Sequence, residues 1–378
     1  MQACPERHQT GHAMTDAQHI RPLTSLRFFA AFWVVLFHYW PALSAAAAPM
    51  VVGKGYLGVE LFFILSGFIL CHVYRTEVEE GRFAYGGFLW ARLARVYPLH
   101  LATLVGMGVL AAAAGAAGFA VDANILSWES LPANLLLMQA WGLAPVAGWN
   151  HPSWSISAEW FAYLTFPLFA WAALALKSRP LTAVVLAAVF MAALYELFAA
   201  LAGHPLTLAT IRWGALRIVP CFALGCALHS LWRARPARSV PWAVAGAAFS
   251  GAGAFGLASI GASDTLIVLS LGGLIFFLAR AAQAGSNLMS AAPLTYLGEI
   301  SYSIYMICVP WKIVFVNGVS SLLKLEGDQL PLAVWLIGVA AVVPLAAVSY
   351  HLIEKPARDR MKLWAGLWKG RAPKVAGA

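Results

Sequence analysis

The stretch LTSLRFFAAFWVVLFHYW, Leu23–Trp40, decides the fold, because it is apolar and long enough to cross a lipid bilayer as a single helix. It nevertheless carries Arg27 near one end and His38 in the other half. An ionisable side chain at the centre of a membrane span costs roughly 2.5–3.5 kcal/mol on insertion scales, so its default interpretation is functional and it needs a partner. The stretch therefore predicts a membrane protein with a polar site inside the membrane.

Composition extends this prediction to the whole chain of 378 residues. Hydrophobic residues make up 61% of it and charged residues only 11%, against roughly half and a quarter in soluble domains. A net charge of +9 would favour nucleic acid in a soluble protein. Here the Lys and Arg gather in particular short loops, which indicates membrane orientation and a lipid bilayer as partner, with no nucleic acid. The five Cys show no metal-ligand spacing, and we expect no metal and no permanently bound cofactor.

Apolar segments of membrane-spanning length recur along the chain and predict an all-α fold of about ten transmembrane helices. We expect a disordered lead-in over residues 1–21, a transmembrane domain over 22–356 and a basic tail over 357–378. A shorter apolar piece, Leu131–Trp141, is too brief to cross and is expected to be re-entrant or interfacial. The predicted spans are Leu23–Leu43, Tyr56–Tyr74, Tyr97–Ala117, Trp154–Leu176, Leu181–Ala202, Trp213–Trp232, Trp242–Ile260, Thr265–Ala282, Leu294–Val316 and Leu332–Ile353.

Basic and nearly uncharged loops alternate between these spans, so both termini are predicted to be cytoplasmic. The alternative is a cleavable signal peptide, because Arg21, the following apolar run and the small-residue stretch ALSAAAAP resemble one. Cleavage would leave nine spans and break the alternation of charge, which favours an uncleaved first helix. The basic connections carry Arg75, Arg82, Arg92 and Arg95, then Lys177 and Arg179, then Arg233, Arg235 and Arg238, then Arg280.

Arg27 and His38 face the same groove. Eleven residues separate them, so on a helix their directions differ by about 20° and they lie about 16.5 Å apart along the axis. Taken alone, Arg27 is explained by an anchor whose charge reaches the interface, and His38 by a hydrogen bond between helices. Their shared face favours a functional role for both. Burial favours the neutral imidazole, which is the form that a general base needs.

Charged residues near the outer ends of three other spans predict a polar cluster around His38. Span two opens with GYLGVELFFILSGF and places Glu60 just inside the outer boundary, while WSISAEWFAY in span four places Glu159 at a similar depth. Span six contributes Arg217 in RIVPCFALG. We expect these groups to neutralise one another in a cavity. Further candidate substrate-binding residues beside them are Ser66, Ser157, Tyr163 and Tyr305.

The stretch ARLARVYP sets Arg92 and Arg95 three residues apart, on one helical face just before span three. Two guanidinium groups so placed suit phosphate recognition, since each presents several donors in a fixed plane. The alternative is that the pair only sets topology, as basic residues at the ends of spans commonly do.

With these residues identified, the sequence resembles the membrane-bound acyltransferase family 3, whose members O-acylate surface polysaccharides, lipopolysaccharide, peptidoglycan and some small molecules. The resemblance runs from about Pro22 to Arg360. It implies that Arg27 and His38 are essential, with His38 near the acyl-transfer centre, and that Arg92 and Arg95 serve the donor. Two positions depart from the family pattern: Glu60 stands where Asp is frequent, and Cys308 where a His is frequent. The motifs, in order, are the Arg27–His38 spacing, GYLGVELFFILSGF, RLARVYP, WSISAEWFAY, RIVPCFALG, LGEISYSIYM and SYHLIEKPAR.

The resemblance implies an O-acyltransferase of the bacterial inner membrane. The expected donor is an acyl-CoA, with acetyl-CoA the simplest, and the expected acceptor is a hydroxyl of a cell-surface glycan or lipid-linked saccharide. We expect His38 to remove the hydroxyl proton and Glu159 to orient the resulting imidazolium. The alternative is a transporter or flippase that moves a glycan or anion through the same cavity. Such a transporter is expected to show paired broken helices in two related halves, and no such repeat is evident.

Overall fold

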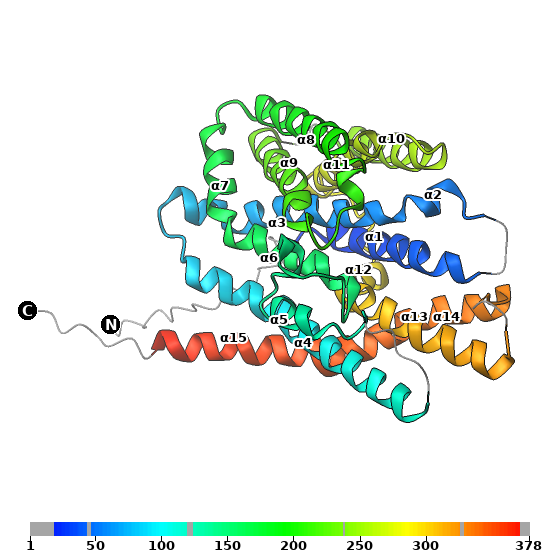
Figure 1. Cartoon of the computed structure of the whole chain (residues 1–378). Coiled ribbons are helices and arrows are strands. Elements are labelled where there is room, and N and C mark those ends of the chain that lie inside the picture. The colour runs from blue at the N-terminus through cyan, green and yellow to red at the C-terminus, as the bar shows by residue number, and fades with distance from the viewer. Residues whose placement is uncertain (1–18, 44–46, 119–123, 237–238, 326–328, 371–378) are drawn as a thin grey trace, which may run out of the picture.

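The computed structural model describes residues 19–43, 47–118, 124–236, 239–325 and 329–370, and within them the fold is all-helical (Figure 1). In these ranges nine helices are long and apolar enough to cross a membrane, and a bent pair of helices makes ten if it counts as one span. The prediction of a polytopic all-α protein with about ten spans is confirmed. The expected disordered lead-in falls almost entirely outside the described residues, as does the middle of the ALSAAAAP stretch.

Most of the spanning helices lie side by side with their axes roughly along one direction, and α7 is turned away from it (Figure 1). The shorter helices are α2 (Met50–Gly53), α5 (Leu131–Leu135) and α12 (Ala292–Glu299), and α15 (Lys355–Gly370) ends the described chain. The segment Leu131–Trp141, expected not to cross, forms only α5 and the start of a π turn. The spans are α1 (Arg21–Tyr39), α3 (Gly58–Glu79), α4 (Tyr85–Ala116), the pair α6 (Trp154–Leu164) and α7 (Phe166–Ala175), α8 (Pro180–Ala202), α9 (Gly214–Ala234), α10 (Val240–Ser259), α11 (Asp264–Gln283), α13 (Ser301–Leu323) and α14 (Leu332–Ser349).

Two predicted spans are broken in the structure. The predicted fourth span bends by 57° between α6 and α7, because Pro167 in the first turn of α7 has no N–H to donate and its ring clashes with the carbonyl group four residues earlier. The predicted ninth span begins earlier than the real one: α12 stops at Glu299 and α13 starts at Ser301. At this break the hydroxyl of Ser301 bonds the Gly298 carbonyl at 2.7 Å, and Gly298 lies against the backbone of α1.

Two other helices run further than predicted. Helix α4 begins at Tyr85 and continues through Pro98, so Arg92 and Arg95 lie within the helix and not before it. The last span passes from α14 through a π turn, Tyr350–Glu354, into α15. The residues predicted as the start of a basic tail therefore form a helix, which runs alongside the first turns of α4 (Figure 1).

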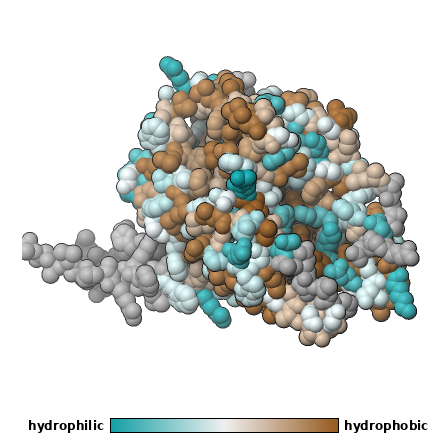
Figure 2. All heavy atoms as spheres, viewed as in Figure 1, coloured by the Kyte–Doolittle hydropathy of each residue, from teal (hydrophilic) through white to brown (hydrophobic). Residues whose placement is uncertain are grey.

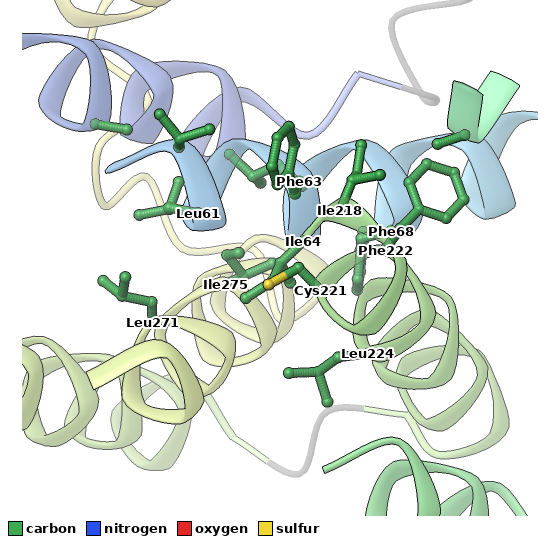
Figure 3. Packing of buried hydrophobic residues seen from close by; sticks show 14 of the residues in the cluster. Leu61, Phe63, Ile64, Phe68, Ile218, Cys221, Phe222, Leu224, Leu271 and Ile275 are labelled. Carbon is green, nitrogen blue, oxygen red and sulfur yellow. The ribbon is translucent and has the colours of Figure 1, made fainter. Parts of the chain in front are cut away.

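Helix α3 lies at the centre of the bundle and packs closely on α9. A Cβ atom added at Gly67 would collide with the Phe222 carbonyl, and one added at Gly225 with the Ile64 carbonyl, so only glycine allows this approach. Around the crossing, Ile64 and Phe222 are fully buried in an apolar cluster shared with α11 (Figure 3). Large apolar side chains also cover much of the outer surface seen in Figure 2, as a bilayer-facing surface requires.

The bundle has two ends, which we name by their contacts. At the basic end, α3 stops and α4 begins; there Arg75 donates to the hydroxyl of Ser230 at 2.8 Å, and Trp90 donates to the Met361 carbonyl of α15 at 2.8 Å. At the far end, α1 stops and α3 begins, and Lys54 pairs with Asp264 at 2.6 Å. Arg27 lies toward the basic end of α1 and His38 toward the far end.

Candidate active site

A polar site fills the interior toward the basic end, where α1, α3, α4 and α6 meet. Glu159 of α6 accepts a hydrogen bond from the hydroxyl of Ser66 on α3 and another from Tyr163, one turn further along its own helix. The guanidinium of Arg27 is close enough to interact with the charges of Glu159 and Glu354. Arg27 therefore has two carboxylates nearby that offset its charge, as a charge inside a membrane requires.

Arg92 and Arg95 project into the same region from α4. Arg92 donates to the Tyr74 hydroxyl at 3.3 Å and lies 5.6 Å from the centre of that ring. Arg95 interacts with the charge of Arg27, and both α4 arginines with Tyr163. Buried Nε of Arg92 and buried Nη2 of Arg95 have no hydrogen-bond partner among the described residues. Buried donors are rarely left unpaired, so these two atoms indicate the place of an anionic ligand or of water.

Glu354, the last residue of the π turn before α15, links the last helices to this site. It accepts hydrogen bonds from Ser303 of α13 at 2.8 Å and from Arg358 of α15 at 3.3 Å. Tyr302 donates to the Val96 carbonyl of α4 at 2.6 Å and so joins α13 to the helix of the two arginines. The motifs SYSIYM and SYHLIEKPAR meet here. Sequence reasoning missed Glu354, although it is a carboxylate at the end of an apolar span in SYHLIEKPAR.

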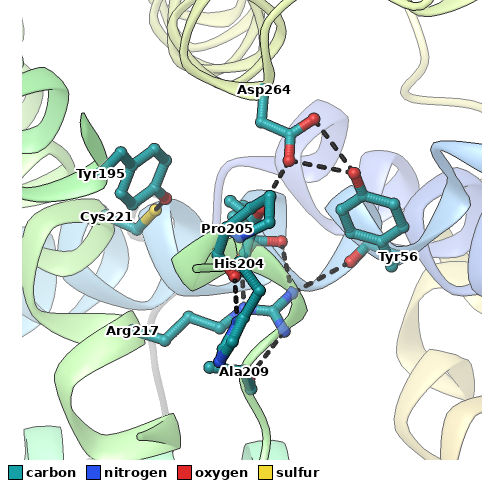
Figure 4. A network of polar contacts seen from close by, with 10 residues as sticks. Tyr56, Tyr195, His204, Pro205, Ala209, Arg217, Cys221 and Asp264 are labelled. Atoms are coloured by element: carbon teal, nitrogen blue, oxygen red, sulfur yellow. Dashed lines mark hydrogen bonds and ion pairs between the residues drawn. The ribbon is translucent and has the colours of Figure 1, made fainter. Parts of the chain in front are cut away.

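Glu60 and Arg217 form a separate ion pair toward the far end. Arg217 Nε lies 2.5 Å from Glu60 Oε1, and Arg217 Nη2 lies 3.0 Å from Oε2. The same guanidinium donates to the Ala209 carbonyl at 2.9 Å (Figure 4) and lies 4.6 Å from the centre of the Trp154 ring. Both charged side chains are fully buried. The sequence placed both groups in one cluster with Glu159 and His38, and the structure pairs these two with each other.

The predicted four-residue cluster of Glu60, Glu159, Arg217 and His38 is wrong. Glu159 contacts Ser66, which lies six residues beyond Glu60 on α3, or about 9 Å along the helix. The cause is the loop before α6, which enters the bundle, so that Trp154 at the start of α6 already lies at the level of Arg217. Hydropathy alone placed the starts of both helices at the membrane boundary.

His38 meets a different set of residues. Its ring lies 6.5 Å from the ring of His151, centre to centre and at 82°, and the charge of Lys312 on α13 is close enough to interact with it. His38 and His151 are both half-buried. Sequence reasoning missed His151 and Lys312, although each is an ionisable residue in an apolar context, in GWNHPSW and VPWKIVF.

Ser157 and Tyr305 hold the loop that carries His151. The hydroxyl of Ser157 accepts from the backbone N–H of Ala140 at 3.0 Å, and Tyr305 donates to the Pro152 carbonyl at 3.0 Å. Cys308 is fully buried and its thiol donates to the Tyr305 carbonyl at 3.1 Å. Both hydroxyls predicted to bind substrate are thus engaged with backbone. No group of three or more metal-ligating side chains gathers within the described residues.

The described helices form a membrane-spanning bundle with arginines inside it toward one end and an imidazole pair toward the other. Residues 22–351 match the family model of acyltransferase 3, described as an acyltransferase domain. The chain belongs to this family. It is therefore a multi-pass membrane member of the acyltransferase 3 family.

Curated relatives agree with this assignment. The chain is 37% identical over 162 residues to acyltransferase MdmB of Streptomyces mycarofaciens, covering 39% of this chain and 38% of that protein. It is 25% identical over 385 residues to O-acetyltransferase OatA of Staphylococcus aureus, covering 92% of this chain and 58% of that protein. The chain thus matches well under two thirds of the length of either relative. No solved structure matches the chain significantly.

Proposed function

We propose that this chain is an O-acyltransferase that moves an acyl group, acetyl in the simplest case, from acyl-CoA to a hydroxyl of a cell-surface glycan or lipid-linked saccharide. The observation that carries the proposal is the pair of sites on one face of α1. Arg27 lies with unpaired arginine donors toward the basic end, and His38 lies with a second imidazole toward the far end. An O-acetyltransferase among the relatives supports the choice of acetyl and of an oxygen acceptor.

The donor is proposed to enter from the basic end. Phosphates of acyl-CoA would occupy the region of Arg92 Nε and Arg95 Nη2, the two buried donors without partners. The separation of Arg27 and His38, about 16.5 Å along α1, then spans the pantetheine arm. Glu159, positioned by hydrogen bonds from Ser66 and Tyr163, is proposed to hold the Arg27 guanidinium in position. This role replaces the one predicted from the sequence, in which Glu159 orients His38.

Acyl transfer is proposed to take place at His38. Neutral His38 removes the proton from the acceptor hydroxyl while the oxygen attacks the thioester carbonyl. The C–O bond forms, the C–S bond breaks, and the departing thiolate takes the proton from the imidazolium. His151, across from His38, is placed to hold the acceptor oxygen between the two rings.

The test is turnover by the purified full chain in neutral-lipid nanodiscs. With acetyl-CoA and a mixture of surface glycans, free CoA thiol is expected to appear only when the acceptor is present, and mass spectrometry is expected to show the ester. Thiol release at the same rate without acceptor would mean hydrolysis only. Transport of the glycan without release of thiol would overturn the proposal in favour of a flippase.

Location and orientation are part of the proposal: the bacterial inner membrane, with both termini cytoplasmic. The starts of α1 and α4 and the helix α15 lie at the basic end, as the positive-inside rule requires for a cytoplasmic face. A fluorescent reporter fused after Ala378 is expected to fluoresce, and a phosphatase fused there to be inactive. The reverse result would overturn the orientation.

A further inference from the structure

Helix α15 packs against the first turns of α4, the helix that carries Arg92 and Arg95. It begins at Lys355, directly after the buried Glu354, and its Met361 carbonyl accepts a hydrogen bond from Trp90 of α4 at 2.8 Å. Trp90 lies within two residues of Arg92 on that helix. The helix is therefore fixed against the element that carries the two arginines, and Figure 1 shows it beside α4 at that end of the bundle.

The charges of α15 add to those of α4. The ammonium of Lys362 is close enough to interact with the charges of Arg92, Arg95 and Arg358. Lys362 and Arg358 are four residues apart, so they share one face of the helix. Among the groups that act most strongly on Lys362, the carboxylate is that of Asp359.

These cations lack enough negative charge to balance them. Asp359 is already shared with Lys355 at 3.4 Å and Arg358 at 3.9 Å, and Glu354 is bound by Arg358 and Ser303. Grouping like charges without counter-charge costs free energy, so the arrangement is favourable only when an anion binds. The two unpaired buried arginine donors are independent observations that indicate such an anion.

The cations also form a series in depth. Lys362 is exposed, Arg92 and Arg95 are half-buried on α4, and Arg27 is half-buried on α1, the helix that also carries His38. Coenzyme A has a matching series of groups: a 3′-phosphate on the ribose, then the pyrophosphate, then the pantetheine arm and the thioester. The charge furthest from the reacting carbonyl is the 3′-phosphate, and the outermost cation is Lys362.

We propose that α15 is part of the donor site and that Lys362 binds the 3′-phosphate of the coenzyme. The inference rests on the proposed function, because it requires acyl-CoA as the donor. It adds a recognition element from the last helix, which would make the enzyme distinguish coenzyme A from the same molecule without its 3′-phosphate. Anionic lipid headgroups offer the same chemistry, and Leu363 and Trp364 next to Lys362 are exposed as in an interfacial helix. The experiment must separate the two sources of phosphate.

The experiment is calorimetric binding of CoA and of dephospho-CoA to the full chain in nanodiscs of phosphatidylcholine, which carry no net charge. Wild type is expected to bind CoA more tightly than dephospho-CoA. Lys362→Gln is expected to weaken CoA binding roughly three- to tenfold, as for a partly exposed charge pair, and to leave dephospho-CoA binding unchanged. Arg360→Gln is the matched control: it removes the same charge from the same helix, two residues away and on another face.

Equal weakening of CoA and dephospho-CoA by Lys362→Gln, or an equal loss in Arg360→Gln, would overturn the assignment of the 3′-phosphate. An effect of Lys362→Gln that appears only when phosphatidylglycerol is added to the nanodisc would show a lipid contact instead. Failure of the proposed function is a different result: wild type itself would then bind neither CoA nor dephospho-CoA. Thermal unfolding of each variant confirms that the fold is intact.

Discussion

Two groups of arginines inside the helix bundle have opposite surroundings. Arg217 has a bidentate carboxylate partner in Glu60, a backbone carbonyl and an aromatic face, and it is fully buried. Arg92 and Arg95 are half-buried and have fewer hydrogen-bond partners than Arg217. Each keeps a buried nitrogen without a hydrogen bond among the described residues. Both groups lie within membrane helices, where a charge is costly.

The comparison separates structural charges from functional ones. Each nitrogen of the Arg217 guanidinium has a hydrogen-bond partner within the protein, and the Glu60–Arg217 pair joins α3 to α9. A charge with unused donors keeps the capacity to bind a ligand, although it stabilises the empty protein less. The number of guanidinium nitrogens with hydrogen-bond partners therefore distinguishes a structural arginine from a ligand-binding one, where residue type and depth in the membrane do not.

The largest predicted effect is on stability and concerns the Glu60–Arg217 ion pair. Arg217→Ala leaves the Glu60 carboxylate buried without a partner, and we expect the free energy of unfolding to fall by about 3–5 kcal/mol. Replacing both residues, Glu60→Met with Arg217→Met, is expected to recover most of that loss because no buried charge remains. Chemical denaturation in mild detergent measures both. A double variant as unstable as Arg217→Ala would mean that the ion pair contributes more than its own neutralisation.

The second prediction concerns the imidazole pair, which belongs to neither arginine group. His38→Ala is expected to lower turnover by at least about a hundredfold, as the loss of a general base does, while CoA affinity and unfolding temperature stay unchanged. His204→Ala, which alters an exposed histidine between α8 and α9, is the control. Turnover of His38→Ala within tenfold of wild type would remove the base assignment.

The third prediction concerns Arg92 and Arg95, the two arginines that keep unpaired nitrogens. Arg92→Gln combined with Arg95→Gln is expected to weaken acyl-CoA binding at least about tenfold, because hydrogen bonds to charged groups contribute roughly 1.5–3 kcal/mol each. Little change in the free energy of unfolding is expected, in contrast to Arg217→Ala. Calorimetry and denaturation of the same preparation give both values. Unchanged CoA affinity would return the two arginines to the role of topology determinants.

The smallest predicted effect is at Glu159. Glu159→Gln keeps the hydrogen bond to Ser66 but removes the charge that faces Arg27, and we expect turnover to fall about three- to tenfold, equivalent to about 1 kcal/mol. Ser66→Ala, which removes the hydrogen bond and keeps the charge, is expected to cost less. If instead Glu159→Gln shifted the pH profile of the step that depends on His38, the carboxylate would lie closer to the imidazole than the structure places it.

Much of the fold followed from the sequence, since membrane spans are defined by their length and apolar content. The breaks in the fourth and ninth spans were missed, because a Pro in the first turn after a break and a Gly against a neighbouring helix are common within membrane helices. For the site, helix periodicity predicted that Arg27 and His38 share a face. It could not predict that His151 would lie opposite His38.

The sequence by itself determined that this protein crosses the membrane about ten times, that Arg27 and His38 lie on one face of the first helix, and that Glu60 and Arg217 need partners inside the bilayer. These are properties of single helices and of charge in lipid. Only the tertiary structure decided which charges meet. Helices slide along one another without changing their hydropathy, so the depth of Glu159 and its separation from Glu60 came from the loop that inserts before α6 and from the glycine contact between α3 and α9.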